Sequence, residues 1–122
     1  MKRLVLLVLL PLSMPSFADW GDVYHCQENT HSRTTLEGER TDYKPVKFKF
    51  KLDENRKAMV FGKGGVFSGT VMVLREHLSL PSQESWSAID FYSMGYFNKG
   101  KALLSMTTST GLTSISANCV KL

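Results

Sequence analysis

Apolar and polar residues alternate along one stretch of the chain. In residues 46–52 the apolar positions Val46, Phe48, Phe50 and Leu52 are separated by the lysines Lys47, Lys49 and Lys51. Side chains of a β-strand point alternately to its two faces, so the apolar set shares one face and the lysines share the other. The segment therefore predicts a strand with one buried and one solvent-exposed face.

Short apolar segments recur through the rest of the chain, separated by residues that favour turns. Turn signals stand at residues 53–56, 62–65, 98–100 and 109–111, which are rich in Asp, Asn, Ser and Gly. We expect strands at residues 57–61, 66–74, 101–108 and 112–120, a strand or strand pair at residues 85–97 bent near Gly95, and a loop at residues 77–84. The polar segment 28–44 is expected to extend the first strand and then loop over. After the first 18 residues, no segment shows convincing helical periodicity.

The first 18 residues have the pattern of a secretory signal peptide. Two basic residues precede an apolar run at residues 4–10, and Ser16 and Ala18 supply the small side chains of a cleavage site. The apolar run is shorter than the about 20 residues that cross a bilayer, so we expect no stable membrane insertion after cleavage. The mature protein then begins at Asp19, and residues 19–122 form a single domain that is periplasmic or secreted.

Two cysteines, Cys26 and Cys119, lie near the two ends of the mature chain. Disulfides persist in exported proteins, and two thiols allow one intramolecular pairing, so we expect a Cys26–Cys119 bridge. The bridge requires the first and last strands to be neighbours or to face each other across a core. The expected fold is all-β: a small antiparallel up-and-down barrel, or a sandwich, of roughly six to eight strands with this link.

Residue types that carry catalysis form no recognised motif in this chain. The patterns GxSxG, HExxH and GxxxxGK[ST] are absent. His25, Glu28 and His31 offer one alternative, a small hydrolase or metal-binding protein in which they bind a metal or relay a proton. Two histidines six positions apart define no ligand geometry, however. We therefore expect no enzyme, no metal site and no cofactor.

The lysine stripe Lys47, Lys49 and Lys51 raises the question of a nucleic-acid partner. Two of the 15 basic residues lie in the leader, so the mature domain has 13 basic and 11 acidic side chains, a net charge of +2. Acidic residues also follow directly at Asp53 and Glu54. Lysines on an exposed strand keep a sheet soluble and prevent edge-to-edge pairing. No nucleic-acid partner is expected.

Aromatic residues gather at Trp86, Tyr92, Tyr96 and Phe97. Aromatic side chains of strands usually belong to the core, but a solvent-exposed set can stack on a sugar or an apolar ligand. Trp86 and Tyr92 share one strand parity, while Phe91 takes the other. Trp86 and Tyr92 are therefore candidate partner-binding residues.

Three short segments resemble the periplasmic inhibitors of C-type lysozyme. They are VYHC at residues 23–26, NKGKAL at residues 98–103, and NC at residues 118–119. The family consists of small exported β-barrels in which a bridge ties the early and late strands. The resemblance implies a protein inhibitor whose loops enter a lysozyme cleft, including a lysine-bearing loop near Lys99 or Lys101.

These observations favour an exported, non-catalytic and monomeric binding module whose partner is an unidentified protein or small ligand. The most specific form of this hypothesis is a protein that inhibits a secreted hydrolase such as C-type lysozyme. Lys99 and Lys101 are candidate partner-binding residues, because they stand on a short exposed turn and carry flexible cations suited to an acidic cleft. The alternative is a carrier that holds a small apolar ligand in a barrel cavity, lined by Phe48, Phe50 and Val71.

Overall fold

The structure is a computed structural model that describes residues 18–75 and 84–122, and over these residues it contains nine strands. They are β1 (Val23–Thr35), β2 (Arg40–Asp42), β3 (Lys47–Asp53), β4 (Ala58–Phe61), β5 (Val71–Leu74), β6 (Ser85–Ile89), β7 (Ser93–Asn98), β8 (Lys101–Thr108) and β9 (Gly111–Lys121). The predicted leader, except Ala18, and the predicted loop at 77–84, except Glu84, lie outside the described residues. The described residues include no helix able to cross a membrane.

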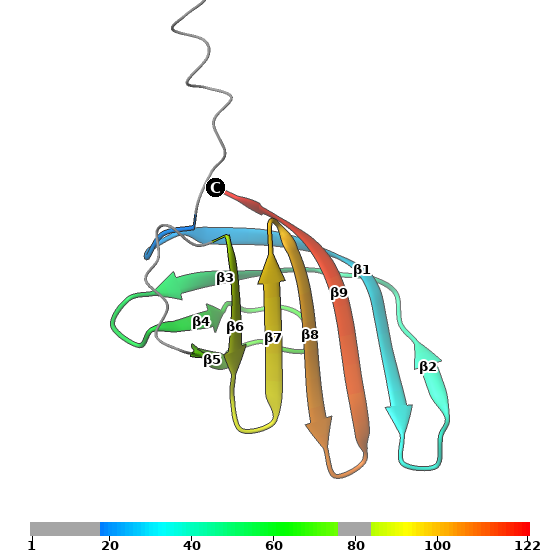
Figure 1. Cartoon of the computed structure of the whole chain (residues 1–122). Helices are drawn as coiled ribbons and strands as arrows, with labels where there is room; N and C mark the ends of the chain where they lie inside the picture. Colours follow the sequence, from blue (N-terminus) through cyan, green and yellow to red (C-terminus); the bar gives the residue numbers. More distant parts are fainter. Residues whose placement is uncertain (1–17, 76–83) are drawn as a thin grey trace, which may run out of the picture.

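Eight of the nine strands close into an antiparallel barrel (Figure 1). Each strand from β3 to β8 pairs with the next one along the chain, β3 also pairs with β1, and β9 pairs back with β1. The short strand β2 pairs with the far end of β1 and is an addition to the barrel. The predicted all-β, up-and-down barrel is therefore confirmed, and of the two predicted architectures the sandwich is the one not formed.

Cys26 and Cys119 form the predicted disulfide. The two residues are direct partners in the β1–β9 ladder, and their Cα atoms are 4.0 Å apart. The bridge therefore joins neighbouring strands along the seam that closes the barrel, and it does not cross the core. A disulfide between residues 93 positions apart fits an oxidising location such as the periplasm or the extracellular medium.

The alternating segment forms β3 and follows the prediction residue by residue. Phe48, Phe50 and Leu52 are buried, and the three lysines between and before them are exposed. Val46 departs from the prediction: it precedes β3 and is exposed. Its backbone carbonyl accepts a hydrogen bond from the N–H of Glu28, which fixes the loop against β1 and leaves the Val46 side chain at the surface.

Aromatic rings fill the barrel interior. Trp86 stacks on Phe97 with ring centroids 4.3 Å apart, and Tyr24 stacks on Phe50 at 5.1 Å. Phe50 also meets Phe97 edge-on, at 5.9 Å. Phe48, which the carrier hypothesis places around a cavity, instead packs against other core side chains. The centre of the barrel is thus a close-packed core.

Two turns lie elsewhere than the sequence predicts. The strand expected at residues 66–74 begins at Val71, because residues 66–69 form a turn in which Gly69 has a φ of +76°. The chain reverses at residues 90–92 rather than near Gly95. Gly95 lies within β7, and a Cβ there would stand 2.9 Å from Leu104 Cδ2 and 3.3 Å from Met72 Sδ. Close packing, not a bend, requires this glycine.

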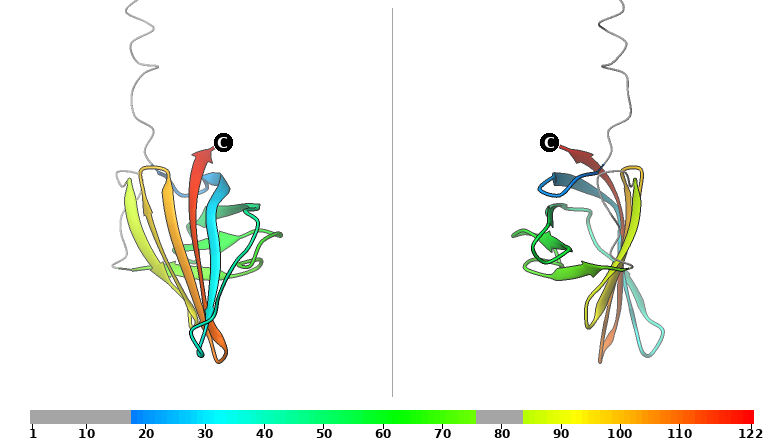
Figure 2. Two further views of the ribbon diagram at one scale, coloured as in Figure 1. Left: turned by 90° about the vertical axis from the view of Figure 1, so that its right-hand side faces the viewer. Right: turned by 60° about the vertical axis from the view of Figure 1, so that its left-hand side comes forward.

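Halfway along its length, β1 exchanges one of its neighbours. Residues 23–27 pair with β3, and after a β-bulge between Glu28 and Thr30 the strand pairs with β2 on that edge. It pairs with β9 along its whole length on the other edge. The far ends of β8, β9 and β1 consequently extend beyond β3–β5 (Figures 1 and 2). The inner face of this extension is open at one end of the barrel.

Candidate functional site

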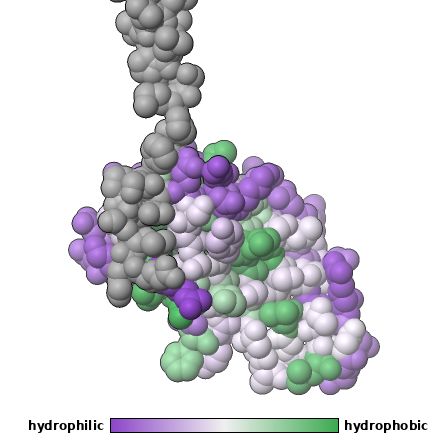
Figure 3. Space-filling view, viewed as in Figure 1, coloured by the Kyte–Doolittle hydropathy of each residue, from purple (hydrophilic) through white to green (hydrophobic). Residues whose placement is uncertain are grey.

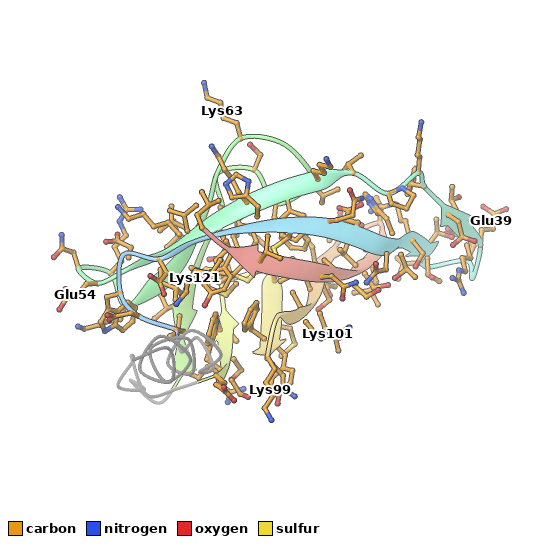
Figure 4. All side chains as sticks on the ribbon, turned by 90° about the horizontal axis from the view of Figure 1, so that it is seen from above. Glu39, Glu54, Lys63, Lys99, Lys101 and Lys121 are labelled. Carbon is orange, nitrogen blue, oxygen red and sulfur yellow. A yellow bond between two sulfur atoms is a disulfide. The ribbon has the colours of Figure 1, made fainter. Side chains whose placement is uncertain are left out.

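The β7–β8 hairpin presents the two lysines that the sequence singles out. Its two-residue loop has a positive φ at both Lys99 (48°) and Gly100 (83°), as a type I′ turn requires. Figure 4 shows Lys99 and Lys101 on the same side of the barrel. Lys99 Nζ lies 4.0 Å from a carboxylate oxygen of Glu84, and Lys101 Nζ donates to Asn118 Oδ1 at 3.1 Å. The turn is therefore a well-defined hairpin tip with two positive charges.

The outward-facing side of the same hairpin is apolar. Tyr96 and Leu103 are direct cross-strand partners and are 48% and 59% exposed, and Met94 is exposed beside them. Serine and threonine side chains surround them on β6, β8, β9 and β1: Thr30, Ser87, Ser105, Ser114 and Ser116. We call these eight residues the neutral face.

The neutral face is hollowed and carries no charge. A depression of about 500 Å³ lies over it, and all of the residues that line the depression are uncharged. Figure 3 shows apolar patches over β7–β9, set among residues of intermediate hydropathy, with strongly hydrophilic residues toward the rim. Small hydroxyl side chains thus leave the larger Tyr96, Leu103 and Met94 standing above their surroundings.

The two aromatic candidates from the sequence lie in different environments. Trp86 is 2% exposed and stacked in the core, so it cannot serve as a surface contact in this structure. Tyr92 is 67% exposed on the β6–β7 turn, beside the exposed ring of Phe91 with centroids 5.6 Å apart. The shared parity of Trp86 and Tyr92 fails because β6 ends at Ile89 and the turn interrupts the alternation.

Sequence reasoning missed Met94 and Leu103, and named Tyr96 without selecting it. The signal was present: apolar neighbours in one strand must face opposite sides of the sheet. In the pairs Tyr96–Phe97 and Leu103–Leu104, the second residue of each is buried and the first is exposed. Which member faces inward could not be decided without the strand register.

The proposed cluster of His25, Glu28 and His31 is only half formed. His25 is exposed on the outer face of β1, whereas His31 lies on the inner face beyond the bulge. Glu28 has a fully buried side chain, and its Oε1 lies 3.0 Å from His31 Nδ1 and accepts from the backbone N–H of Val46 at 3.0 Å. Glu28 Oε2 has no hydrogen-bond partner among the described residues. The two histidines therefore do not converge on a metal.

A second hollow, which we call the mouth cleft, opens at the end of the barrel where β1 leaves β3. Its volume is about 520 Å³, and it is lined by His31, Arg33, Tyr43, Lys44, Val46, Val66, Met106 and Thr113. The imidazole of His31 packs against the Tyr43 ring, with centroids 5.0 Å apart. Among the residues that the structure describes, no acidic side chain lines this cleft.

Burial perturbs the ionisation of one core side chain. The pKa of Tyr24 is raised from 10.0 to about 12, first by desolvation in the core and then by the negative charge of Asp22. Tyr24 packs against Phe50, Trp86 and Phe97, so its phenol supports the core and remains protonated at neutral pH.

Comparisons with known proteins give no further guide to the site. None of the family models, curated proteins or solved structures compared with this chain matches it. Within residues 18–75 and 84–122, no three His, Cys, Asp or Glu side chains gather as a metal site requires. The site must therefore be argued from its own geometry.

Proposed function

We propose that this protein is an exported, non-catalytic binding protein that docks on a partner protein through the neutral face and the adjoining hairpin tip. The observation that carries the proposal is the exposed group of Met94, Tyr96 and Leu103 on a hydrogen-bonded hairpin. Protein interfaces concentrate their energy in a few apolar and aromatic side chains near the centre of the contact. Large exposed side chains beside a hollow provide such a centre.

The scaffold beneath the neutral face reduces the entropic cost of binding. β7 pairs with β6 and β8, and β8 pairs with β9, so every strand under the apolar group is held on both edges. Gly95 and Leu104, which lie between the exposed residues, pack against each other within the barrel. Because the backbone that carries these side chains is already ordered by the sheet, little backbone freedom is lost on association.

The hairpin tip adds charge at the edge of this surface. Lys101 stands two positions before Leu103 on β8, and Lys99 lies in the loop that joins β7 to β8. A partner that covers the neutral face therefore meets two cations at its rim. An acidic surface would be attracted to them, mainly through faster association. Glycoside hydrolases carry a pair of carboxyl groups in their clefts. Together with the resemblance to lysozyme inhibitors, this favours inhibition of a secreted hydrolase such as C-type lysozyme, in the periplasm or the medium.

Inhibition of C-type lysozyme in a cell-wall lysis assay tests the proposal. The wild-type mature domain is expected to inhibit, and Leu103→Ser is expected to raise the inhibition constant at least about tenfold, as for the loss of a hot-spot side chain. The double variant Lys99→Ala, Lys101→Ala should also inhibit less well, and its deficit should shrink as salt is added. Val120→Ser changes a similarly exposed apolar residue outside the neutral face and serves as the control.

Two outcomes would overturn the proposal in different ways. Absence of inhibition by the wild type would end the lysozyme hypothesis. Inhibition by the wild type that is unchanged in both Leu103→Ser and the double lysine variant would show that the neutral face and its hairpin tip are not the binding surface.

A further inference from the structure

We propose that the mouth cleft is a binding site for a small anionic amphiphile, a molecule with one carboxylate or phosphate group on an apolar chain. The cleft is formed by β1, the segment after β2, and the inner faces of β8 and β9, whereas the neutral face lies on the outer side of the sheet. The two sites share no residue. The inference therefore does not depend on the proposed function.

Arg33 provides the anion-binding group. Its guanidinium donates to the hydroxyls of Thr113, at 3.5 Å, and Thr110. Over the described residues, none of the ion pairs includes Arg33. Two neutral hydroxyls orient the planar group but leave its charge uncompensated, and three further N–H donors remain for a ligand, because a guanidinium has five. Arginine suits carboxylate and phosphate groups through paired hydrogen bonds.

The charge around Arg33 supports an anion and not a cation. Lys44 and His31 line the same cleft, and no acidic side chain of residues 18–75 or 84–122 does. The side chain of Glu28, which contacts His31, is fully buried, and its Oε1 lies 3.0 Å from His31 Nδ1. The cleft thus presents two fixed positive charges to a ligand that enters it.

The remaining walls provide apolar contact. Val46 and Val66 are each 40% exposed and face the cleft together with the partly buried Met106. Because these apolar side chains line the same cleft as Arg33, the cleft suits a ligand with an apolar chain next to its charged group. The volume of about 520 Å³ lies within the range of roughly 300–1,000 Å³ that is usual for small-molecule sites.

Glu28 fixes the two walls relative to each other. Its Oε1 interacts with His31 on β1 and also accepts from the N–H of Val46, which stands in the segment after β2. The backbone N–H of Tyr43 donates to the carbonyl of His31 at 2.8 Å, and the two rings pack together. Glu28 thus links β1 to the segment after β2 behind the cleft.

Isothermal titration calorimetry of the mature domain with decanoate tests the site. Decanol has a similar chain without the charge, and acetate has the charge without the chain, so both should bind at least about tenfold more weakly than decanoate if both walls contribute. Decyl phosphate in place of decanoate distinguishes a phosphate-preferring from a carboxylate-preferring site. Absence of saturable binding by both decanoate and decyl phosphate, or equal affinity for decanoate and decanol, would overturn the proposal.

Two variants locate the binding. Arg33→Met removes the charge but keeps a long side chain, and Val66→Asp places a negative charge in an exposed wall position; each should weaken binding at least about tenfold. Arg56→Met and Val120→Asp are the matched controls outside the cleft and should bind as the wild type does. If Arg33→Met fails to fold, Val66→Asp still tests the site, because it changes an exposed residue. Unchanged affinity in Val66→Asp, or in a folded Arg33→Met, would refute the placement, whatever the lysozyme assay shows.

Discussion

Replacement of Phe50 by alanine tests the assignment of the two faces of β3. The Phe50 side chain is 1% exposed, and its ring contacts Tyr24, Phe61 and Phe97 at centroid distances of 5.1, 5.7 and 5.9 Å. Lys49, the preceding residue, points to the solvent from the opposite face. The variants Phe50→Ala and Lys49→Ala therefore change neighbouring residues whose side chains lie on opposite faces of the sheet.

The expected cost of Phe50→Ala follows from these contacts. Truncating a buried phenylalanine costs about 3–5 kcal/mol, because transfer free energy is lost and a cavity remains. Pairs of aromatic rings contribute about 0.5–1.5 kcal/mol beyond their buried area. Since Phe50 takes part in several such pairs, we expect a value at the upper end of the first range. For Lys49→Ala we expect a change within about 0.5 kcal/mol.

Urea unfolding of the oxidised protein measures the difference. Tryptophan fluorescence is a suitable probe, because Trp86 stacks on Phe97 in the same core. The midpoint of Phe50→Ala should fall strongly at an unchanged slope, while that of Lys49→Ala stays near the wild type. A destabilisation of similar size in both variants would refute the assignment of buried and exposed faces.

Three further predictions concern the covalent and ionisation states of the chain. Reduction of Cys26–Cys119 should destabilise the fold by about 4–5 kcal/mol on the chain-entropy model, seen as a lower melting temperature; free alkylation of both thiols in native exported protein would contradict the bridge. Burial raises the pKa of Tyr24 from 10.0 to about 12, so the folded protein holds the phenol proton more tightly than the unfolded chain does. The free energy of unfolding is therefore unaffected by this group below pH 10, and it falls by about 2–3 kcal/mol as the pH rises through 12. Tyr24→Phe should lack this alkaline loss in denaturant titrations at pH 9 to 12, and an identical pH profile would show that another group is responsible. Intact-mass analysis should find a mature start at Asp19, whose nitrogen lies 2.8 Å from Asp22 Oδ2 and would there become a charged amino group; a retained leader would contradict it.

The sequence predicts most of the architecture because the strands are amphipathic. Regular alternation between Phe48 and Leu52 specifies a face without tertiary information, and the single possible cysteine pairing brings the two ends of the chain together. Boundaries were less predictable where backbone and packing decide. A glycine such as Gly95 often marks a bend. Here the close approach of Leu104 and Met72 explains why the position is a glycine, and those residues meet only in the folded barrel.

The candidate sites were harder to predict, because they depend on register and on a bulge. Tyr96 and Phe97 are both aromatic neighbours in β7, and only the pairing with β8 decides which one reaches the surface. The bulge after Glu28 shifts the parity of β1, so that His31 faces inward while His25 faces outward. A local sequence pattern carries no information on either event.

The central claim, docking through the neutral face and hairpin tip, is tested most directly by mapping the contact on the isotopically labelled mature domain. Amide resonances are followed by NMR while unlabelled C-type lysozyme is added to excess. We expect the perturbed amides to concentrate at residues 94–103, at their cross-strand partners on β6 and β9, and around Thr30 on β1, with residues 43–46 of the mouth cleft unchanged. Perturbations centred away from residues 94–103, or none at all at excess lysozyme, would contradict the account.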